Sequence, residues 1–135
     1  MPRFLMVSDA AAHEPRLLER RVRGALEPQG HTVETAADTE DAGMRLRHED
    51  FSVLIVQVPS LWRCSEEVRL LLSAVSEIQA DPARKPPGVL LYSDKGGDGA
   101  VAEGYMNTRF LMLLSHAFQA SELRAVVRRM LQHRA

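Results

Sequence analysis

The stretch FSVLIVQV, residues 51–58, decides the fold of this chain. It opens as a run of β-branched and other apolar side chains, which is typical of a strand buried on both faces of a parallel sheet. Gln57, a neutral amide, then interrupts the run at its end. Ligands of open α/β sheets bind beyond the carboxyl ends of the strands. The role of Gln57 at the carboxyl end of this buried strand is therefore the first question that the sequence raises.

Other segments repeat the pattern of residues 51–58. RFLMVS (3–8), VLLYS (89–93) and RFLMLLS (109–115) are continuous apolar runs, and we expect these strands also to be covered on both faces. HTVETA (31–36) alternates polar and apolar residues, which predicts a half-buried or edge strand.

Helical patterns separate the strands. We expect helices from Pro15 to about Pro28, over 38–50, from Ser65 to about residue 80, weakly over 100–106, and from Ser121 onward. The first helix has an apolar stripe that comprises Leu17, Leu18, Val22, Ala25 and Leu26. Asp38 or Thr39, Ser65 and Ser121 are suitable N-caps, because their side chains can accept from backbone N–H groups of the first turn.

Strand and helix thus alternate about five times, which predicts a three-layer, doubly wound α/β domain with a five-stranded parallel sheet. A length of 135 residues fits a single domain over 1–135. Cys64 is the only cysteine, so the chain has neither an intramolecular disulfide nor a cysteine-based zinc site. The sequence has no apolar run long enough to span a bilayer. We therefore expect a cytoplasmic protein that does not bind membranes.

The residues at the carboxyl ends of the strands are Ser8 and Asp9, Gln57, Ser93 and His116. These positions, and the order and length of the elements over nearly the whole chain, resemble the receiver domain of bacterial response regulators. In that family two acids after the first strand hold Mg²⁺, and an Asp that ends the third strand accepts the phosphoryl group. A Thr or Ser ends the fourth strand, and a Lys ends the fifth.

The resemblance implies that the phosphoacceptor position is Gln57 and that the acidic pair has become Ser8-Asp9. Ser93 keeps the hydroxyl, and His116 takes the place of the Lys. An amide oxygen is a poor nucleophile, and Asp9 alone offers at most a weak metal site. Histidine is mostly uncharged at neutral pH, so the phosphate clamp is weakened too. The resemblance therefore implies a degenerate, CheY-like pseudo-receiver that needs no cofactor.

We expect Gln57 to fill the former acidic pocket by donating to Asp9 and accepting from Ser8 or Ser93. Carboxylates clustered without a metal repel one another, and a glutamine removes that repulsion. The simpler alternative is that Gln57 is an ordinary hydrogen-bonded residue at a strand end. By the same reasoning, Asp9 more often caps the following helix than binds a metal.

Arginines gather in the first and last helices, either as a solvated face or as a surface for a partner. The candidate contact residues are Trp62, Arg109, Arg124, Arg128 and Arg129. Trp62 follows the strand that carries Gln57, where it either meets a partner or folds over the pocket as a lid. The net charge of -1 and the few aromatic residues do not favour binding of nucleic acid.

The leading hypothesis is a phosphorylation-independent interaction module of two-component-type signalling, with a protein, an output domain or a second copy as its partner. One alternative is a regulatory domain that senses a small ligand at the old pocket. Another is an N-terminal wing domain like that of bacterial amino-acid decarboxylases, which has a similar strand-helix order and serves in oligomer packing. We do not expect an enzyme, because the chain has no G-x-S-x-G elbow and no phosphate-binding loop.

Overall fold

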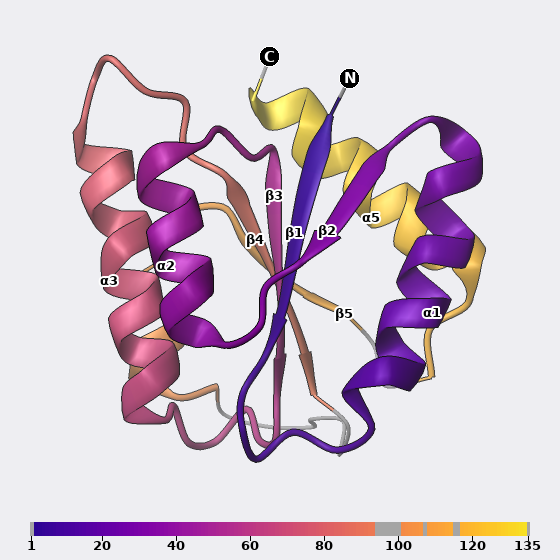
Figure 1. Ribbon diagram of the computed structural model, residues 1–135, viewed down its shortest axis with the longest axis horizontal. Coiled ribbons are helices and arrows are strands. Elements are labelled where there is room, and N and C mark those ends of the chain that lie inside the picture. Colours follow the sequence, from indigo (N-terminus) through magenta and orange to yellow (C-terminus); the bar gives the residue numbers. More distant parts are fainter. Residues whose placement is uncertain (1, 94–100, 107, 115–116, 135) are drawn as a thin grey trace.

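The computed structural model describes residues 2–93, 101–106, 108–114 and 117–134. Its strands form one parallel sheet in the order β2-β1-β3-β4-β5. They are β1 (Arg3–Ser8), β2 (Thr32–Thr35), β3 (Val53–Val58), β4 (Gly88–Ser93) and β5 (Leu111–Leu114). As its unbroken apolar run predicts, β3 lies at the centre of the sheet (Figure 1).

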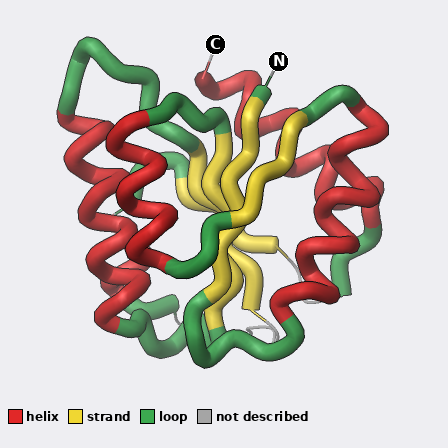
Figure 2. The backbone as a smooth tube through the Cα atoms, in the orientation of Figure 1, coloured by secondary structure: helices red, strands yellow, loops and turns green. Residues whose placement is uncertain are grey.

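Helices cover both faces of this sheet. They are α1 (Pro15–Leu26), α2 (Thr39–His48), α3 (Glu66–Ala80), the single turn α4 (Glu103–Met106) and α5 (Ala120–Arg134), with a 3₁₀ turn, η1 (Glu27–Gln29), after α1. α1 and α5 lie on one face, and α2 and α3 lie on the other (Figures 1 and 2). The predicted three-layer, doubly wound architecture is therefore confirmed. Among the described helices, each one falls short of the length and apolar character that a membrane crossing would need.

The core is divided in two by the sheet, because successive side chains of a strand point to opposite faces. Phe4 and Met6 of β1 pack under α1 and α5, whereas Leu5 and Val7 pack under α2 and α3. All six residues of β3 are buried. Both core halves thus converge on β1 and β3, the strands whose carboxyl ends carry the candidate site.

The predicted helix starts are partly confirmed. The side chains of Asp38 and Ser65 accept hydrogen bonds from backbone N–H groups in the first turns of α2 and α3. The prediction for Ser121 is wrong, because α5 has already begun before this residue. The carboxylate of Glu122 instead accepts from the backbone N–H of Gln119, at 3.2 Å.

The last strand differs from its prediction. β5 is shorter than the expected 109–115, and it is an edge strand that pairs only with β4 among the described strands. Leu113 is 46% exposed and Phe110 is 50% exposed, so the run is not covered on both faces. An apolar run does not distinguish a central strand from an edge strand, and α4, the helix before β5, is only one turn long.

Leu17 of α1 also differs from its prediction, because its side chain is 44% exposed and lies outside the buried stripe of the helix.

Candidate functional site

Parallel pairing brings the carboxyl ends of β1, β3 and β4 together as predicted. Ser8 lies opposite Gln57, and Val58 lies opposite Ser93. The backbone N–H of Asp9 donates to the carbonyl of Gln57 at 2.9 Å. Asp9, Gln57 and Ser93 are 6%, 1% and 2% exposed, which makes this a buried polar cluster. His116, the predicted counterpart of the Lys, lies outside the described residues.

Both polar atoms of the Gln57 amide form hydrogen bonds. The hydroxyl of Ser8 donates to Gln57 Oε1 at 2.8 Å, and Gln57 Nε2 donates to the backbone carbonyl of His13 at 2.6 Å. Acceptance from Ser8 is as predicted. The hydrogen bond described for Nε2 goes to the loop before α1, in place of the predicted donation to Asp9. Since a carboxylate cannot donate to a carbonyl, this arrangement requires the amide that the sequence supplies.

Asp9 is held by a different set of partners. Its carboxylate accepts from the backbone N–H of Ala11 at 2.9 Å and from the hydroxyl of Ser65 at 2.5 Å. Ser65 also accepts from the backbone N–H of Val68, at 3.2 Å, and so caps α3. Asp9 therefore closes its own turn and ties the end of β1 to the start of α3. The sequence identified Ser65 as a cap, but it contained no local signal for this contact with Asp9.

The site residues do not fit a bound Mg²⁺. Ser8 and Gln57 carry no carboxylate at the positions where the resemblance to receiver domains would place one, and Asp9 is already engaged in two hydrogen bonds. Within the described part of the chain, no three His, Cys, Asp or Glu side chains gather as a cation site would need. Mg²⁺ keeps several waters and needs carboxylate anchors. The described residues of the site form a hydrogen-bonded joint between β1, β3 and α3.

The loop after β3 carries Trp62, which is 67% exposed. The buried hydroxyl of Tyr105, from α4, is shared between the carbonyls of Ser60 and Arg63 at 3.0 and 2.9 Å. Burial raises the pKa of the Tyr105 phenol well above its usual value, so the phenol remains a donor. The exposure of the Trp62 side chain favours a contact role for this residue over the alternative of a lid folded onto the pocket.

A close approach between α4 and the loop that carries Trp62 also holds this loop in place. A Cβ on Gly104 would lie 2.9 Å from the Cβ of Cys64, so this position accepts only glycine without a shift. The backbone N–H of Ala102 donates to the carbonyl of Leu61 at 2.8 Å. Burial also raises the pKa of the Cys64 thiol, which favours its protonated form. The loop that carries Trp62 is thus fixed by its contacts with α4 and the residues just before it.

Two arginines of α1 are internal connections and do not belong to a free basic face. The guanidinium of Arg21 lies 3.9 Å from the centre of the Phe118 ring and also donates to the Phe118 carbonyl, at 2.5 Å. Arg23 donates to the carbonyl of Val33 at 2.6 Å and pairs with Glu19 at 3.1 Å. The expectation of a basic partner surface on α1 therefore applies only to its remaining arginines.

The structure separates the five candidate contact residues into two groups. Arg109 precedes β5 and lies at the amino end of the strands, whereas Trp62 follows β3 at the carboxyl end. On α5, Arg128 and Arg129 are exposed and Arg124 is half-buried one turn before Arg128. α5 runs back across the sheet, and Met130 reaches the Gly88 end of β4. Arg109 thus shares the amino end of the sheet with the end of α5 but not with Trp62.

A hollow of about 240 Å³ lies beside Gln57, on the α1 side of the sheet. It is lined by His13, Glu14, Leu17, Leu18, Arg21, Gln57 and Tyr92. It is smaller than the roughly 300–1,000 Å³ that is usual for small-molecule sites. Gln57 and Arg21 are also already engaged, with the partners given above.

No family model matches this sequence, and no curated protein does either. Solved structures do match. The N-terminal domain of a response regulator/sensory box/GGDEF 3-domain protein from Carboxydothermus hydrogenoformans superposes with a TM-score of 0.70. It is 15% identical, over 97% of this chain and 94% of that chain.

Two further structures agree. Chemotaxis protein CheY4 from Vibrio cholerae matches with a TM-score of 0.66 and 20% identity, over 97% of this chain and 99% of that chain. Response regulator TrrA from Thermotoga maritima, in complex with Mg²⁺-BeF, matches with a TM-score of 0.62 and 20% identity, over 97% of this chain and 100% of that one. The chain therefore has the CheY-like fold of response-regulator receiver domains.

Proposed function

We propose that this chain is a pseudo-receiver, a protein-interaction module of two-component-type signalling whose output does not depend on phosphorylation. One observation carries the proposal. The amide of Gln57, which the resemblance to receiver domains assigns to the phosphoacceptor position, is hydrogen-bonded at both ends, to Ser8 and to His13. An amide cannot form a stable acyl phosphate, and no described carboxylate lies ready to replace it. The module therefore works through the shape that it holds constitutively.

We further propose that the chain is not an enzyme. The hydroxyls of Ser8 and Ser65 are engaged with Gln57 and Asp9, and the Cys64 thiol is kept protonated by burial. These side chains support the joint between β1, β3 and α3 and supply no activated nucleophile.

The partner that fits best is another protein, bound at the face formed by β5 and α5. β5 is an edge strand that exposes Leu113, Phe110 is exposed just before it, and Arg128 and Arg129 are exposed on α5. Exposed apolar edge strands are ready-made sites of association. An output domain or a second copy of the chain would fit this face equally well. We also propose a cytoplasmic location, with which the single cysteine is consistent.

The small-ligand alternative has less support, because the hollow beside Gln57 is small and its Gln57 amide and Arg21 guanidinium already form hydrogen bonds. The wing-domain alternative would place the chain next to a pyridoxal-phosphate domain in the same gene. Reading the gene beyond these residues separates that alternative from signalling.

The test is a titration of the backbone amide NMR spectrum with Mg²⁺ and beryllofluoride, which imitates a phosphorylated Asp. The matched control is the double variant Ser8→Asp and Gln57→Asp, which restores the carboxylates of the family pattern around Asp9. We expect no saturable shift at Asp9, Gln57 and Ser93 of the natural chain at millimolar Mg²⁺, and a saturable shift in the double variant. Saturable shifts in the natural chain would show a working phosphorylation site and refute the pseudo-receiver.

A further inference from the structure

A groove of about 730 Å³ runs between α2 and α3, on the opposite side of the sheet from α1 and α5. Gly43 and Ala74 are among its lining residues, so the two helices carry little side-chain bulk there. Met44 and Leu70 also line it, one from each helix, and they are 55% and 62% exposed. Single exposed apolar residues are ordinary, but two that share one groove form a patch.

Gly43 keeps this groove open. A Cβ at Gly43 would meet no atom within 4 Å, so packing inside the chain does not require a glycine. Its φ does not lie in the left-handed region either, since Gly30 is the glycine with a positive φ among the described residues. A glycine inside a helix costs about 1 kcal/mol relative to alanine. Contacts within the described residues therefore do not require a glycine at position 43, as they do not at Gly24 of α1, and the groove is distinguished by the residues that line it.

The groove is strongly acidic. Its charged lining residues are the carboxylates of Asp38, Glu40, Glu67 and Glu77 and the guanidinium of Arg47. Arg47 lies 3.7 Å from Glu77, whereas Glu40 and Glu67 form no ion pair with any residue that the structure describes. Helix dipoles favour acids in the first turns of α2 and α3, but they do not account for the two exposed apolar side chains beside those acids.

We infer that this α2–α3 groove, lined by Gly43, Met44 and Leu70 under an acidic rim, docks a basic amphipathic helix of a partner protein. Two neighbouring helices offer a seam into which a third helix can lay its apolar face. α2 has 10 residues, which makes the seam about 15 Å long, or roughly three turns. Lysine or arginine side chains of the partner would reach Glu40 and Glu67.

A second copy of this chain fits the groove less well. Of its exposed basic helices, α5 has the apolar residues Leu123, Val127 and Met130 buried against its own sheet. α1 exposes Arg16 and Arg20 with the single leucine Leu17, so such a copy would bring at most one apolar side chain for Met44 and Leu70. The inference rests on the proposed function as an interaction module, and it is independent of the state of Gln57.

The probe is a synthetic amphipathic peptide of leucine and lysine, about 14 residues or roughly four turns long. Two control peptides keep its length: one has the same residues in scrambled order, and one carries glutamate in place of lysine. We expect the basic amphipathic peptide alone to give saturable amide shifts at Gly43, Met44 and Leu70. We also expect its Kd to rise with salt, because the rim charges are exposed.

Matched substitutions decide the site. Gly43→Leu fills the groove and should raise the Kd at least about tenfold. Gly24→Leu is the same change on α1, where a Cβ also meets no atom within 4 Å, and it should leave the Kd unchanged. Leu70→Ala should weaken binding, whereas Leu17→Ala, at an exposed leucine of the other layer, should not.

The outcomes distinguish this inference from the proposed function. Shifts confined to β5 and α5 would overturn the groove and leave the interaction module in place, as would equal effects of Gly43→Leu and Gly24→Leu. A peptide that shifts no amide also overturns the groove, while the beryllofluoride titration still tests the pseudo-receiver separately. If sedimentation shows a dimer that only Gly43→Leu dissociates, the occupant is a second copy, and the foreign helix is wrong.

Discussion

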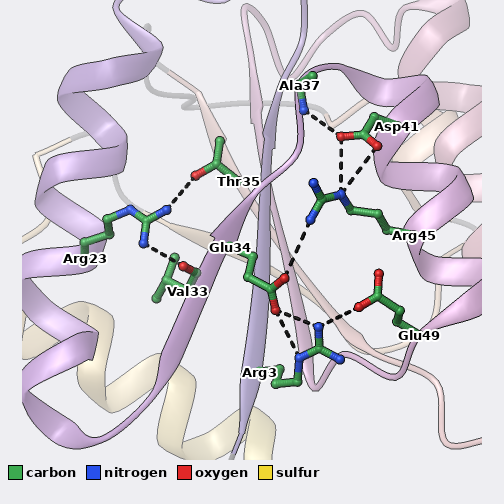
Figure 3. Close-up of polar contacts among 9 residues, drawn as sticks. All are labelled: Arg3, Arg23, Val33, Glu34, Thr35, Ala37, Asp41, Arg45 and Glu49. Carbon is green, nitrogen blue, oxygen red and sulfur yellow. Dashed lines mark hydrogen bonds and ion pairs between the residues drawn. The ribbon is translucent and has the colours of Figure 1, made fainter.

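At its carboxyl end, β1 is joined to the rest of the molecule by buried hydrogen bonds that include a single carboxylate, that of Asp9, whereas at its amino end it is joined by a half-exposed cluster of ion pairs. Ser8 reaches His13 through the amide of Gln57. At the other end, Arg3 Nη2 lies 2.7 Å from carboxylate oxygens of both Glu34 and Glu49 (Figure 3). Both ends fix β1 to neighbouring elements, one by buried hydrogen bonds and the other by half-exposed ion pairs.

The charged cluster extends across β1, β2 and α2. Arg45 lies 3.6 Å from Glu34 and 3.3 Å from Asp41 (Figure 3). Arg3 is 35% exposed, and its guanidinium lies 4.5 Å from the centre of the Phe51 ring. The hydrogen bonds that Arg3 donates to the carboxylates of Glu49 and Glu34 raise the pKa of Arg3 above its usual value.

The contrast shows where this fold tolerates charge. Half-exposed ion pairs contribute roughly 0–1 kcal/mol each, because water competes for both partners. A buried charge without a partner costs several kcal/mol. The amino end therefore gains little from each of its charges, whereas the end that holds Gln57 would lose much by acquiring a second buried carboxylate beside that of Asp9.

The largest effect is expected for Gln57→Glu, which keeps the shape and changes only the chemistry. The new carboxylate cannot donate to the His13 carbonyl, so we expect the free energy of unfolding to fall by about 2–4 kcal/mol at neutral pH. Burial and the facing carbonyl should raise the pKa of the new carboxyl group in the folded state. The lost stability should therefore return as the pH falls below that pKa, because the protonated group can donate again.

Urea unfolding at several pH values measures this effect. The matched control is Gln79→Glu, since Gln79 Nε2 also donates to a backbone carbonyl, that of Arg109 at 3.0 Å, but at the surface. We expect the control to lose less than about 1 kcal/mol, because water can replace the bond. Equal losses at the two sites would mean that burial does not set the demand for an amide at Gln57.

A smaller effect is expected for Arg3→Met, which keeps an apolar stem over Phe51 and removes the charge. Two half-exposed ion pairs and a cation–π contact predict a loss of about 1 kcal/mol in the free energy of unfolding. Most of the loss should disappear at high salt, which screens exposed charges. Arg16→Met is the control, because Arg16 forms no ion pair with a described residue. A loss that is as large as that of Gln57→Glu and independent of salt would remove the contrast between the two ends.

The sequence predicted much of this arrangement because the signals were local. The apolar runs of β1, β3 and β4 and the caps at Asp38 and Ser65 are read from neighbouring residues. Parallel pairing then places the strand ends together without further information. The gathering of the site residues therefore follows from the predicted topology.

The side-chain partners could not be predicted in the same way. Gln57 meets a carbonyl 44 positions away, and Asp9 meets a hydroxyl 56 positions away. Arg21 looked like part of a solvated basic face, yet its partner, Phe118, lies 97 positions along the chain. The exposure of β5 was missed as well, because an edge strand and a central strand can share one composition. Contacts of this kind depend on side-chain directions that become fixed only when the layers pack.

The smallest effect concerns the pH dependence of the charged cluster. The backbone N–H of Ala37 donates to the Asp41 carboxylate at 2.9 Å, and together with the nearby Arg45 it lowers the pKa of Asp41. A lowered folded-state pKa stabilises the protein above the ordinary pKa of the group, and this contribution is lost as the pH falls through the folded-state value. Asp41→Asn should therefore flatten the acid end of the stability curve, measured by urea unfolding in acidic buffers. Arg45→Gln should keep most of the slope, because the Ala37 N–H is the larger cause; if Arg45→Gln removes the slope instead, the ion pair dominates.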